Sequence, residues 1–173
     1  MRQTRNLLFV LIVVLSSCID KNPNLDTEGK DELKALEATS VPEEDALNYN
    51  QRFYVPIYSD IYVDAQNPKQ LLSATLSIRN THLTDSLFIS KIEYYNTNGN
   101  LVQKFIDYTI NLPPMATVNY VIEKEDDSGG NGANFIVEVS AKSEEIKPLI
   151  QAVMIGNYAN KSFSFLTDGY ALD

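Results

Sequence analysis

Hydrophobic and polar residues alternate with a period of two along most of the chain from residue 53 onward. No window of helical length keeps a 3.6-residue period, and clusters of Gly, Asn, Asp and Pro separate the alternating segments. This pattern predicts eight strands, at residues 53–63, 71–80, 87–96, 101–107, 116–123, 134–141, 150–156 and 162–167.

The alternation also predicts how the strands pack. Apolar residues occupy the even positions from 72 to 78 and the odd positions from 135 to 139, as one buried and one solvated face require. Asn98 and Gly99 supply the positive φ values of a tight turn, which pairs 87–96 with 101–107. Pro56 cannot donate to a β-ladder, so strand 53–63 is expected to be an edge strand or to break there.

Eight short strands with turns about every ten residues predict a single all-β domain over residues 51–173. Two packed antiparallel sheets of seven or eight strands, an immunoglobulin-like β-sandwich, fit this spacing better than a closed barrel.

A different pattern stands at the N-terminus. Arg2 and Arg5 precede nine apolar residues at 7–15, and Ser16 and Ser17 lead to Cys18, the sole cysteine. This segment resembles the signal and lipobox of a bacterial lipoprotein, which implies removal of residues 1–17 and lipid attachment to Cys18. The alternatives are a buried core segment and a membrane-spanning helix, although nine residues span only roughly 14 Å, about half of a hydrocarbon core.

Lipidation of Cys18 by several acyl chains would anchor the protein stably to a membrane and would leave no thiol in the mature domain. Residues 18–50 then form the connection to the domain. Nine acids, three bases and few apolar residues in 19–50 predict a flexible acidic tether, in which residues 31–38 are at most a short helix.

Charge narrows the range of partners. The chain has a formal net charge of -9, and the nine bases from residue 51 onward are scattered singly among fourteen acids. Nucleic acid binding requires clustered Lys and Arg, so we expect no nucleic acid partner.

Several segments in the domain carry a family resemblance. They are YVPIYSDIY from Tyr54, LSATLSIRNT from Leu72, Tyr94 and Tyr95 with Asn98 and Gly99, LPPMATV from Leu112, GGNGANFIVE from Gly129, and QAVMIG from Gln151. With these segments in order, residues 53–168 resemble a bacterial family of lipoproteins and periplasmic proteins catalogued as domain of unknown function number 3124. The resemblance implies the fold and an envelope location but no reaction, because the family has no assigned activity.

Catalytic signals are weak. His82 precedes Asp85 in an expected loop, but one histidine without a nucleophile elbow favours a solvated turn residue over a Ser-His-Asp relay. A zinc site would need more N or S ligands than this chain offers. Adjacent acids stand at 43–44, 126–127 and 144–145, where neighbouring carboxylates point apart and cannot face each other across a glycosidase cleft.

The glycine-rich segment 126–134 has the most unusual backbone chemistry. Counted from Asp127, it approaches a calcium-loop template that ends at Glu138, but Gly129 replaces a ligand there. An anion cradle is a further alternative, opposed by the two acids. We expect a connecting loop whose glycines satisfy positive φ; the residues of a ligand or metal site would be Asp126, Asp127, Gly129, Gly130, Asn131, Gly132, Asn134 and Glu138.

Ten tyrosines and no tryptophan are a surplus for a small domain. Tyr54, Tyr58 and Tyr62 would share one face of an unbroken strand, either in the core or as an exposed aromatic strip for a partner.

Taken together, these features predict a lipid-anchored envelope module that binds a protein partner and has no enzyme activity or cofactor. The alternative is a periplasmic ligand- or calcium-binding domain that assists an enzyme through the 126–134 loop.

Overall fold

The structure is a computed structural model that describes residues 34–62, 64–65 and 69–173. Cys18, the predicted signal peptide and the first part of the predicted tether lie outside the described residues. The chain divides into two units, Met1–Asp31 and Glu32–Asp173, and every described element belongs to the second. Within the described part of the chain, no helix is long and apolar enough to cross a membrane.

In the described part of the chain, eleven strands follow a short 3-10 helix, η1 (Glu44–Ala46). The strands are β1 (Tyr49–Pro56), β2 (Asp60–Ile61), β3 (Gln70–Arg79), β4 (Leu87–Tyr95), β5 (Leu101–Lys104), β6 (Ile110–Leu112), β7 (Thr117–Ile122), β8 (Asn134–Ala141), β9 (Leu149–Tyr158), β10 (Lys161–Asp168) and β11 (Tyr170–Leu172).

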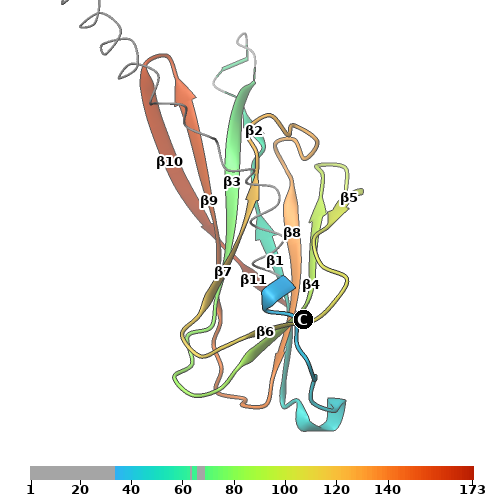
Figure 1. The fold of residues 1–173 in the computed structure, drawn as a ribbon. Helices are drawn as coiled ribbons and strands as arrows, with labels where there is room; N and C mark the ends of the chain where they lie inside the picture. The colour runs from blue at the N-terminus through green and yellow to red at the C-terminus, as the bar shows by residue number, and fades with distance from the viewer. Residues whose placement is uncertain (1–33, 63, 66–68) are drawn as a thin grey trace, which may run out of the picture. The chain divides into compact units, whose positions relative to one another are not determined.

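The strands form two antiparallel sheets (Figure 1). In the first sheet the order is β11-β1-β8-β4-β5, and β6 also pairs with β4. The order in the second sheet is β10-β9-β3-β2, with β7 also paired to β3. The predicted all-β sandwich is therefore confirmed, although β2, β6 and β11 raise the number of strands above the predicted seven or eight.

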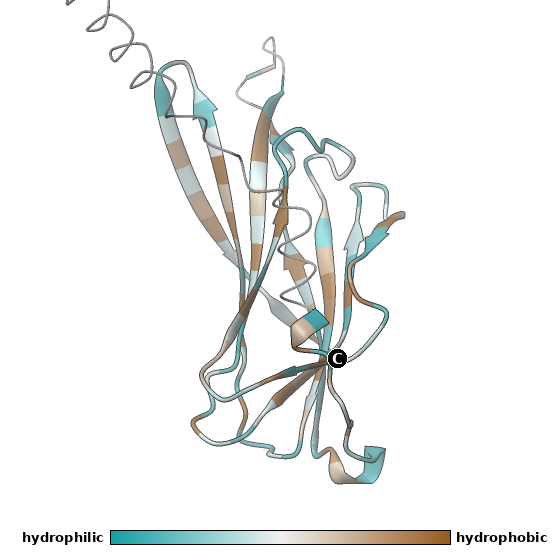
Figure 2. Cartoon of the chain, viewed as in Figure 1, coloured by the Kyte–Doolittle hydropathy of each residue, from teal (hydrophilic) through white to brown (hydrophobic). Residues whose placement is uncertain are grey.

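The core lies between the two sheets. Leu72, Ala74, Leu76 and Ile78 of β3 and Phe135, Val137 and Val139 of β8 belong to it, as the alternation predicts. The core also includes Phe53 and Val55 of β1 and Ile150, Ala152 and Met154 of β9. Apolar and polar bands alternate along β9 and β10 in Figure 2 for the same reason. Each buried aliphatic side chain of this kind contributes about 1.5–3 kcal/mol to folding.

The predicted strand 53–63 breaks at Pro56, which is one of the two outcomes expected from this proline; it is not an edge strand. β1 ends at Pro56 and lies between β8 and β11 in the first sheet, whereas β2 pairs with β3 in the second. The chain crosses from one sheet to the other at residues 57–59. The alternation does not reveal this crossing, because Ile57 and Ser59 are buried like Phe53 and Val55 and so continue the same period.

The hairpin between β4 and β5 is confirmed, but its turn differs from the prediction. Gly99 has a φ of 77°, whereas Asn98 is not among the residues with positive φ. The side chain of Asn96 holds the turn instead, because its Oδ1 accepts hydrogen bonds from the N–H groups of Asn98 and Asn100, both at 3.0 Å.

The last part of the predicted tether lies against the sandwich. Glu37 forms an antiparallel bridge with Ile110 of β6, and Ala38 N–H donates to Thr109 O at 2.8 Å. Leu36 packs against the core, and β1 begins at Tyr49, ahead of the predicted boundary at 51. The sequence could not show this docking, because backbone groups rather than a hydrophobic pattern make most of it.

Candidate functional site

The glycine-rich loop 126–134 connects β7 to β8, and one side chain of the neighbouring hairpin holds it in place. Thr97 N–H and Oγ1 donate hydrogen bonds to Gly129 O at 2.8 and 3.0 Å. Gly132 N–H donates to the same Thr97 Oγ1 at 2.9 Å. The loop is thus tied to the turn after β4.

The crossing between the sheets holds the other side of the loop. Ser59 N–H donates to Gly130 O at 3.0 Å, and Ile57 N–H donates to Ala133 O at 2.9 Å. Both acceptors are backbone carbonyls of the loop, so backbone hydrogen bonds attach the loop to the crossing.

The glycines of the loop meet two different requirements. Gly130 has a φ of 74°, as expected, but Gly129 and Gly132 do not have positive φ. A Cβ on Gly129 would lie 1.8 Å from Tyr94 Oη and 2.6 Å from Ser59 Oγ, so that position has no room for a side chain. Close approach, rather than backbone conformation, therefore requires Gly129.

Under this glycine lies a buried pair of hydroxyls. Ser59 Oγ and Tyr94 Oη are 2.7 Å apart, and both residues are fully buried. Burial raises the pKa of Tyr94, and the hydrogen bond with Ser59 offsets only part of that rise. The phenol therefore stays protonated at neutral pH, and the pair links β4 to the crossing between the sheets.

Glu138, the terminal ligand of the predicted calcium loop, is paired with cations instead. Asp126 Oδ1 accepts hydrogen bonds from the N–H and the hydroxyl of Ser128. Glu138 lies in β8, on the solvent face of the first sheet, with Oε1 at 2.7 Å from Arg52 Nη2 and 3.1 Å from Lys91 Nζ. Among the described residues, no group of three or more His, Cys, Asp or Glu could hold a metal ion.

The remaining predicted loop residues do not converge on a ligand position. Asp127 is exposed, Asn131 is half-buried in the loop, and Asn134 already belongs to β8, opposite Pro56. The loop therefore brings together glycine backbone and buried hydroxyls rather than a set of converging ligands.

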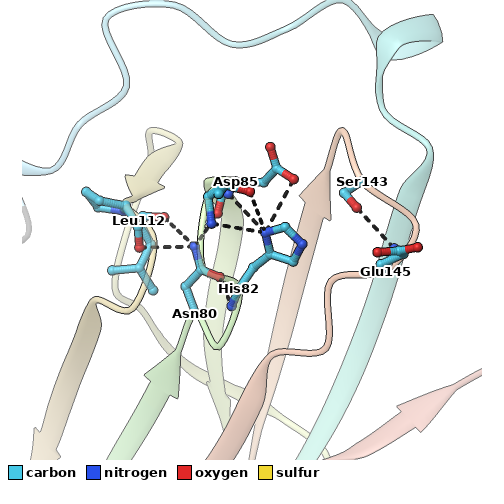
Figure 3. Close-up of polar contacts among 8 residues, drawn as sticks. Asn80, His82, Asp85, Leu112, Ser143 and Glu145 are labelled. Atoms are coloured by element: carbon cyan, nitrogen blue, oxygen red, sulfur yellow. Dashed lines mark hydrogen bonds and ion pairs between the residues drawn. The ribbon is translucent and has the colours of Figure 1, made fainter.

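His82 lies in the loop between β3 and β4 (Figure 3). Its Nδ1 accepts a hydrogen bond from Asp85 N–H at 3.0 Å and lies 3.3 Å from Asp85 Oδ2. Ser59 is at the other end of β3, since Leu72 N–H donates to Ser59 O at 2.8 Å. A strand of this length spans roughly 25–30 Å, so His82 and Ser59 cannot form a relay.

Asn80, which sequence reasoning did not select, organises this end of the sandwich (Figure 3). Its buried side-chain amide donates to Asp85 O at 2.8 Å, to Pro113 O at 3.0 Å and to Leu112 O at 3.1 Å. Its Oδ1 accepts His82 N–H at 3.0 Å. The loop after β3 and the turn after β6 are thereby fixed together, and the histidine is part of a structural turn.

The other acid pairs lie on the surface. Glu43 and Glu44 are exposed at the start of η1, and Glu144 and Glu145 are exposed in the loop between β8 and β9. Ser143 Oγ accepts a hydrogen bond from Glu145 N–H at 3.2 Å, which closes that turn (Figure 3). Both pairs are therefore exposed to solvent.

The three tyrosines do not form a strip, because the strand that would carry them is broken. Tyr54 lies opposite Tyr170 on the solvent face of the first sheet. Tyr58 packs edge-on against Phe165 with ring centroids 5.9 Å apart. Tyr62 is 61% exposed, and Lys69 Nζ lies 5.6 Å from its ring centroid.

The solvent face of the first sheet is covered by interlocked charges. In addition to the pairing of Glu138 with Arg52 and Lys91, Glu93 accepts a hydrogen bond from Tyr95 Oη at 2.8 Å and pairs with Lys104 at 3.2 Å. Burial raises the pKa of Glu93, but the bonds from Tyr95 and Lys104 outweigh it, so the pKa lies below its usual value. The pKa of Glu138 is lowered in the same way, by Arg52 and Lys91 against burial.

The solvent face of the second sheet is very different. Leu166, Val153, Thr75 and Val121 form one row across β10, β9, β3 and β7, and Ile155 lies between Ser164 and Ser73 in the next. We call the outward side chains of these four strands the neutral face: residues 71, 73, 75, 77 and 79; 117, 119 and 121; 149, 151, 153, 155 and 157; and 162, 164, 166 and 168. Only Arg79 and Asp168 among them are charged.

Large apolar side chains are exposed on the neutral face. Leu166 is 56% exposed, Val121 49% and Ile155 48%. Single exposed apolar residues are ordinary, but neighbouring ones without charges mark a surface for interaction. The sequence shows that alternate positions of these four strands are uncharged. Only the strand order shows that these positions form one surface.

Comparison with known proteins places the chain in a family. Residues 50–172 match the family described as "Protein of unknown function (DUF3124)". The chain belongs to this family. The resemblance found in the sequence is thus confirmed over nearly the whole sandwich.

Two further comparisons add no function. The crystal structure of Thermotoga maritima 1070 is 15% identical, with a TM-score of 0.39 over 71% of this DUF3124 chain and 95% of that chain. No curated protein matches.

Substitution of Gly129 tests the structural role of the loop. Gly129→Ala should lower the free energy of unfolding by about 3 kcal/mol, because its Cβ would collide with Tyr94 Oη. Gly132→Ala is the matched control: its Cβ would lie 3.2 Å from Thr97 Cγ2, and the cost should stay below about 1 kcal/mol. Urea denaturation measures both, and equally small losses would show that the loop can move aside.

Acid should weaken the charged face. The folded pKa values of Glu93 and Glu138 are lowered, so their contribution is complete above the unfolded pKa of about 4.3 and is lost as pH falls through the folded values. The melting temperature should therefore fall less between pH 6 and pH 3 in Glu93→Gln/Glu138→Gln than in the parent. An unchanged pH dependence in the double variant would contradict this assignment.

Proposed function

We propose that this DUF3124 protein is a lipid-anchored, non-catalytic module of the bacterial cell envelope that binds a protein partner through the neutral face. The observation that carries the proposal is the contrast between the two solvent faces. The chain has a net charge of -9, but the neutral face of its sandwich carries only two charged residues, Arg79 and Asp168.

The chemistry of the neutral face favours a protein as the partner. Phosphate or anionic lipid would require clustered cations, and this face holds a single arginine. Its exposed residues are aliphatic, Ser, Thr and Asn, which suit the apolar centre and polar rim of a protein interface.

The groups that could support catalysis have structural partners instead. His82 Nδ1 accepts a backbone N–H, and Tyr94 is hydrogen-bonded to Ser59 inside the sandwich. Asp126 closes its own turn onto Ser128. These bonds support a binding role rather than a reaction.

The location rests on the sequence. Cys18 follows a basic and apolar leader, and an acidic segment separates it from the sandwich. Like-charge repulsion from anionic headgroups would hold the domain clear of the membrane, where the neutral face is accessible.

The anchor is tested at Cys18. Cys18→Ser should abolish labelling by radioactive palmitate and release the protein from the membrane fraction, because the thioether to the lipid forms on that sulfur. Ser17→Ala leaves the sulfur in place and should retain both. If Cys18→Ser keeps its label and stays in the membrane, the lipoprotein assignment is wrong.

Binding is tested by photo-crosslinking in intact cells. A photoreactive phenylalanine analogue at Leu166 or Ile155 should give one discrete adduct on electrophoresis, whereas the same residue at Ser90, exposed on β4 of the first sheet, should give none. The mass of the adduct identifies the partner as foreign or as a second copy. If neither Leu166 nor Ile155 yields an adduct, the face is not an interaction surface.

A further inference from the structure

β10 is the longest strand that stands at the edge of a sheet. It has eight residues, against six in β7, four in β5, three in β11 and two in β2. Its pairing with β9 is continuous over all eight residues, with no bulge or proline, and its charges, Lys161 and Asp168, stand only at its ends. Natural sheets protect long edges with charges, prolines or bulges, so an edge without these devices is suited to pairing with another strand.

The register with β9 shows which backbone groups face outward. Gly169 N–H donates to Ile150 O at 2.8 Å, and these two residues continue the register in which Thr167 lies opposite Ala152. Hydrogen-bonded and non-hydrogen-bonded pairs alternate in an antiparallel ladder, so the odd residues of β10 bond to β9. Ser162, Ser164 and Leu166 therefore direct their N–H and C=O groups away from β9.

We infer that the partner is a second copy of this chain, joined by antiparallel pairing of β10 with β10 about a two-fold axis at Ser164. This inference rests on the proposed function, because it names the partner that would pair with β10, the edge strand of the neutral face. Ile155 on β9 and Val121 on β7 would stay exposed. The second sheets of the two copies would then form one continuous sheet, in which the two neutral faces lie side by side.

The side chains of β10 are complementary to themselves in this register. Ser164 faces Ser164 of the second copy, a pair small enough to sit on the axis, and Ser162 faces Leu166. On the inner side Phe163 faces Phe165. Both rings are half-buried in one copy, so each would gain an aromatic cross-strand neighbour.

The charges of β10 do not oppose antiparallel self-pairing. The two Lys161 residues would lie at opposite ends of the paired strands, and so would the two Asp168 residues, so no like charges of β10 meet. No other charged residue of the neutral face lies near the axis, because Arg79 is on β3, beyond β9. The net negative charge of two chains is therefore kept away from the contact. A shared membrane anchor would raise the local concentration of copies as a linker does.

Disulfide trapping in membranes tests the register. In the full-length protein, Ser164→Cys should form a crosslinked dimer on mild oxidation, because facing residues in a hydrogen-bonded pair lie about 5.5 Å apart at Cα. Ser162→Cys is the matched control on the same face of the same strand; its two copies would lie roughly 14 Å apart and should not crosslink. The parent chain, with Cys18 alone, controls for a disulfide at the anchor.

Mass measurement tests the association itself. Detergent-extracted full-length protein should have the protein mass of a dimer by light scattering. Ser164→Lys, which places two like charges on the axis, should halve that mass. Asn119→Lys, exposed on the same face at the far strand β7, should leave it unchanged. Far-UV circular dichroism spectra of both variants that match the parent would show that neither substitution disturbs the fold.

The outcomes separate this inference from the proposed function. A parent that is monomeric, with no crosslink at Ser164, overturns self-pairing, and so does a stronger crosslink at Ser162 than at Ser164. If Leu166 then photo-crosslinks to a protein of another mass, the neutral face remains a binding surface for a foreign partner. If it yields no adduct, both statements are wrong.

Discussion

The hydrogen bond between Tyr94 and Ser59 is the contact around which one end of the sandwich is arranged. Tyr94 belongs to β4 of the first sheet, and Ser59 stands where the chain crosses to the second sheet. Gly129 covers the pair so closely that no side chain fits there. This buried contact thus joins β4, the crossing between the sheets and the loop between β7 and β8 at one end of the sandwich.

The opposite end depends on a polar side chain in the same way. Asn80, just beyond β3, donates its amide to three carbonyls in two separate loops. Leaving those carbonyls without donors in a buried place would cost about 1–3 kcal/mol each. β3 therefore runs between two polar clamps, Ser59 at its start and Asn80 at its end, and the alternating aliphatic residues between them form the centre of the core.

The alternation in the sequence predicted the positions of strands that depend only on their own residues. Strands β3, β4, β8 and β10 lie within a residue or two of their expected positions, because a half-buried strand needs alternation in its own residues. The crossing at residues 57–59 could not be read from the same pattern, since the side chains facing the core keep their period through it. β6 and β11, with three residues each, are too short to carry a pattern at all.

The candidate sites, unlike the strands, depend on residues that are distant in the sequence. Segment 126–134 was selected because its glycines and acids are adjacent in sequence, but Tyr94, Ser59 and Thr97, which decide its role, come from other elements. The neutral face is built from four strands, and each contributes only a few uncharged positions. Both features depend on strand order, which alternation does not specify.

The two solvent faces also differ in what a partner would have to displace. On the first sheet, the carboxylates of Glu93 and Glu138 already have cationic partners, so binding there would break or bury ion pairs at a cost in desolvation. At the β10 edge of the neutral face, binding would remove water from Leu166 and would leave few charges to desolvate. The balance of these terms favours association through the second sheet, and the unprotected edge of β10 gives that association a direction.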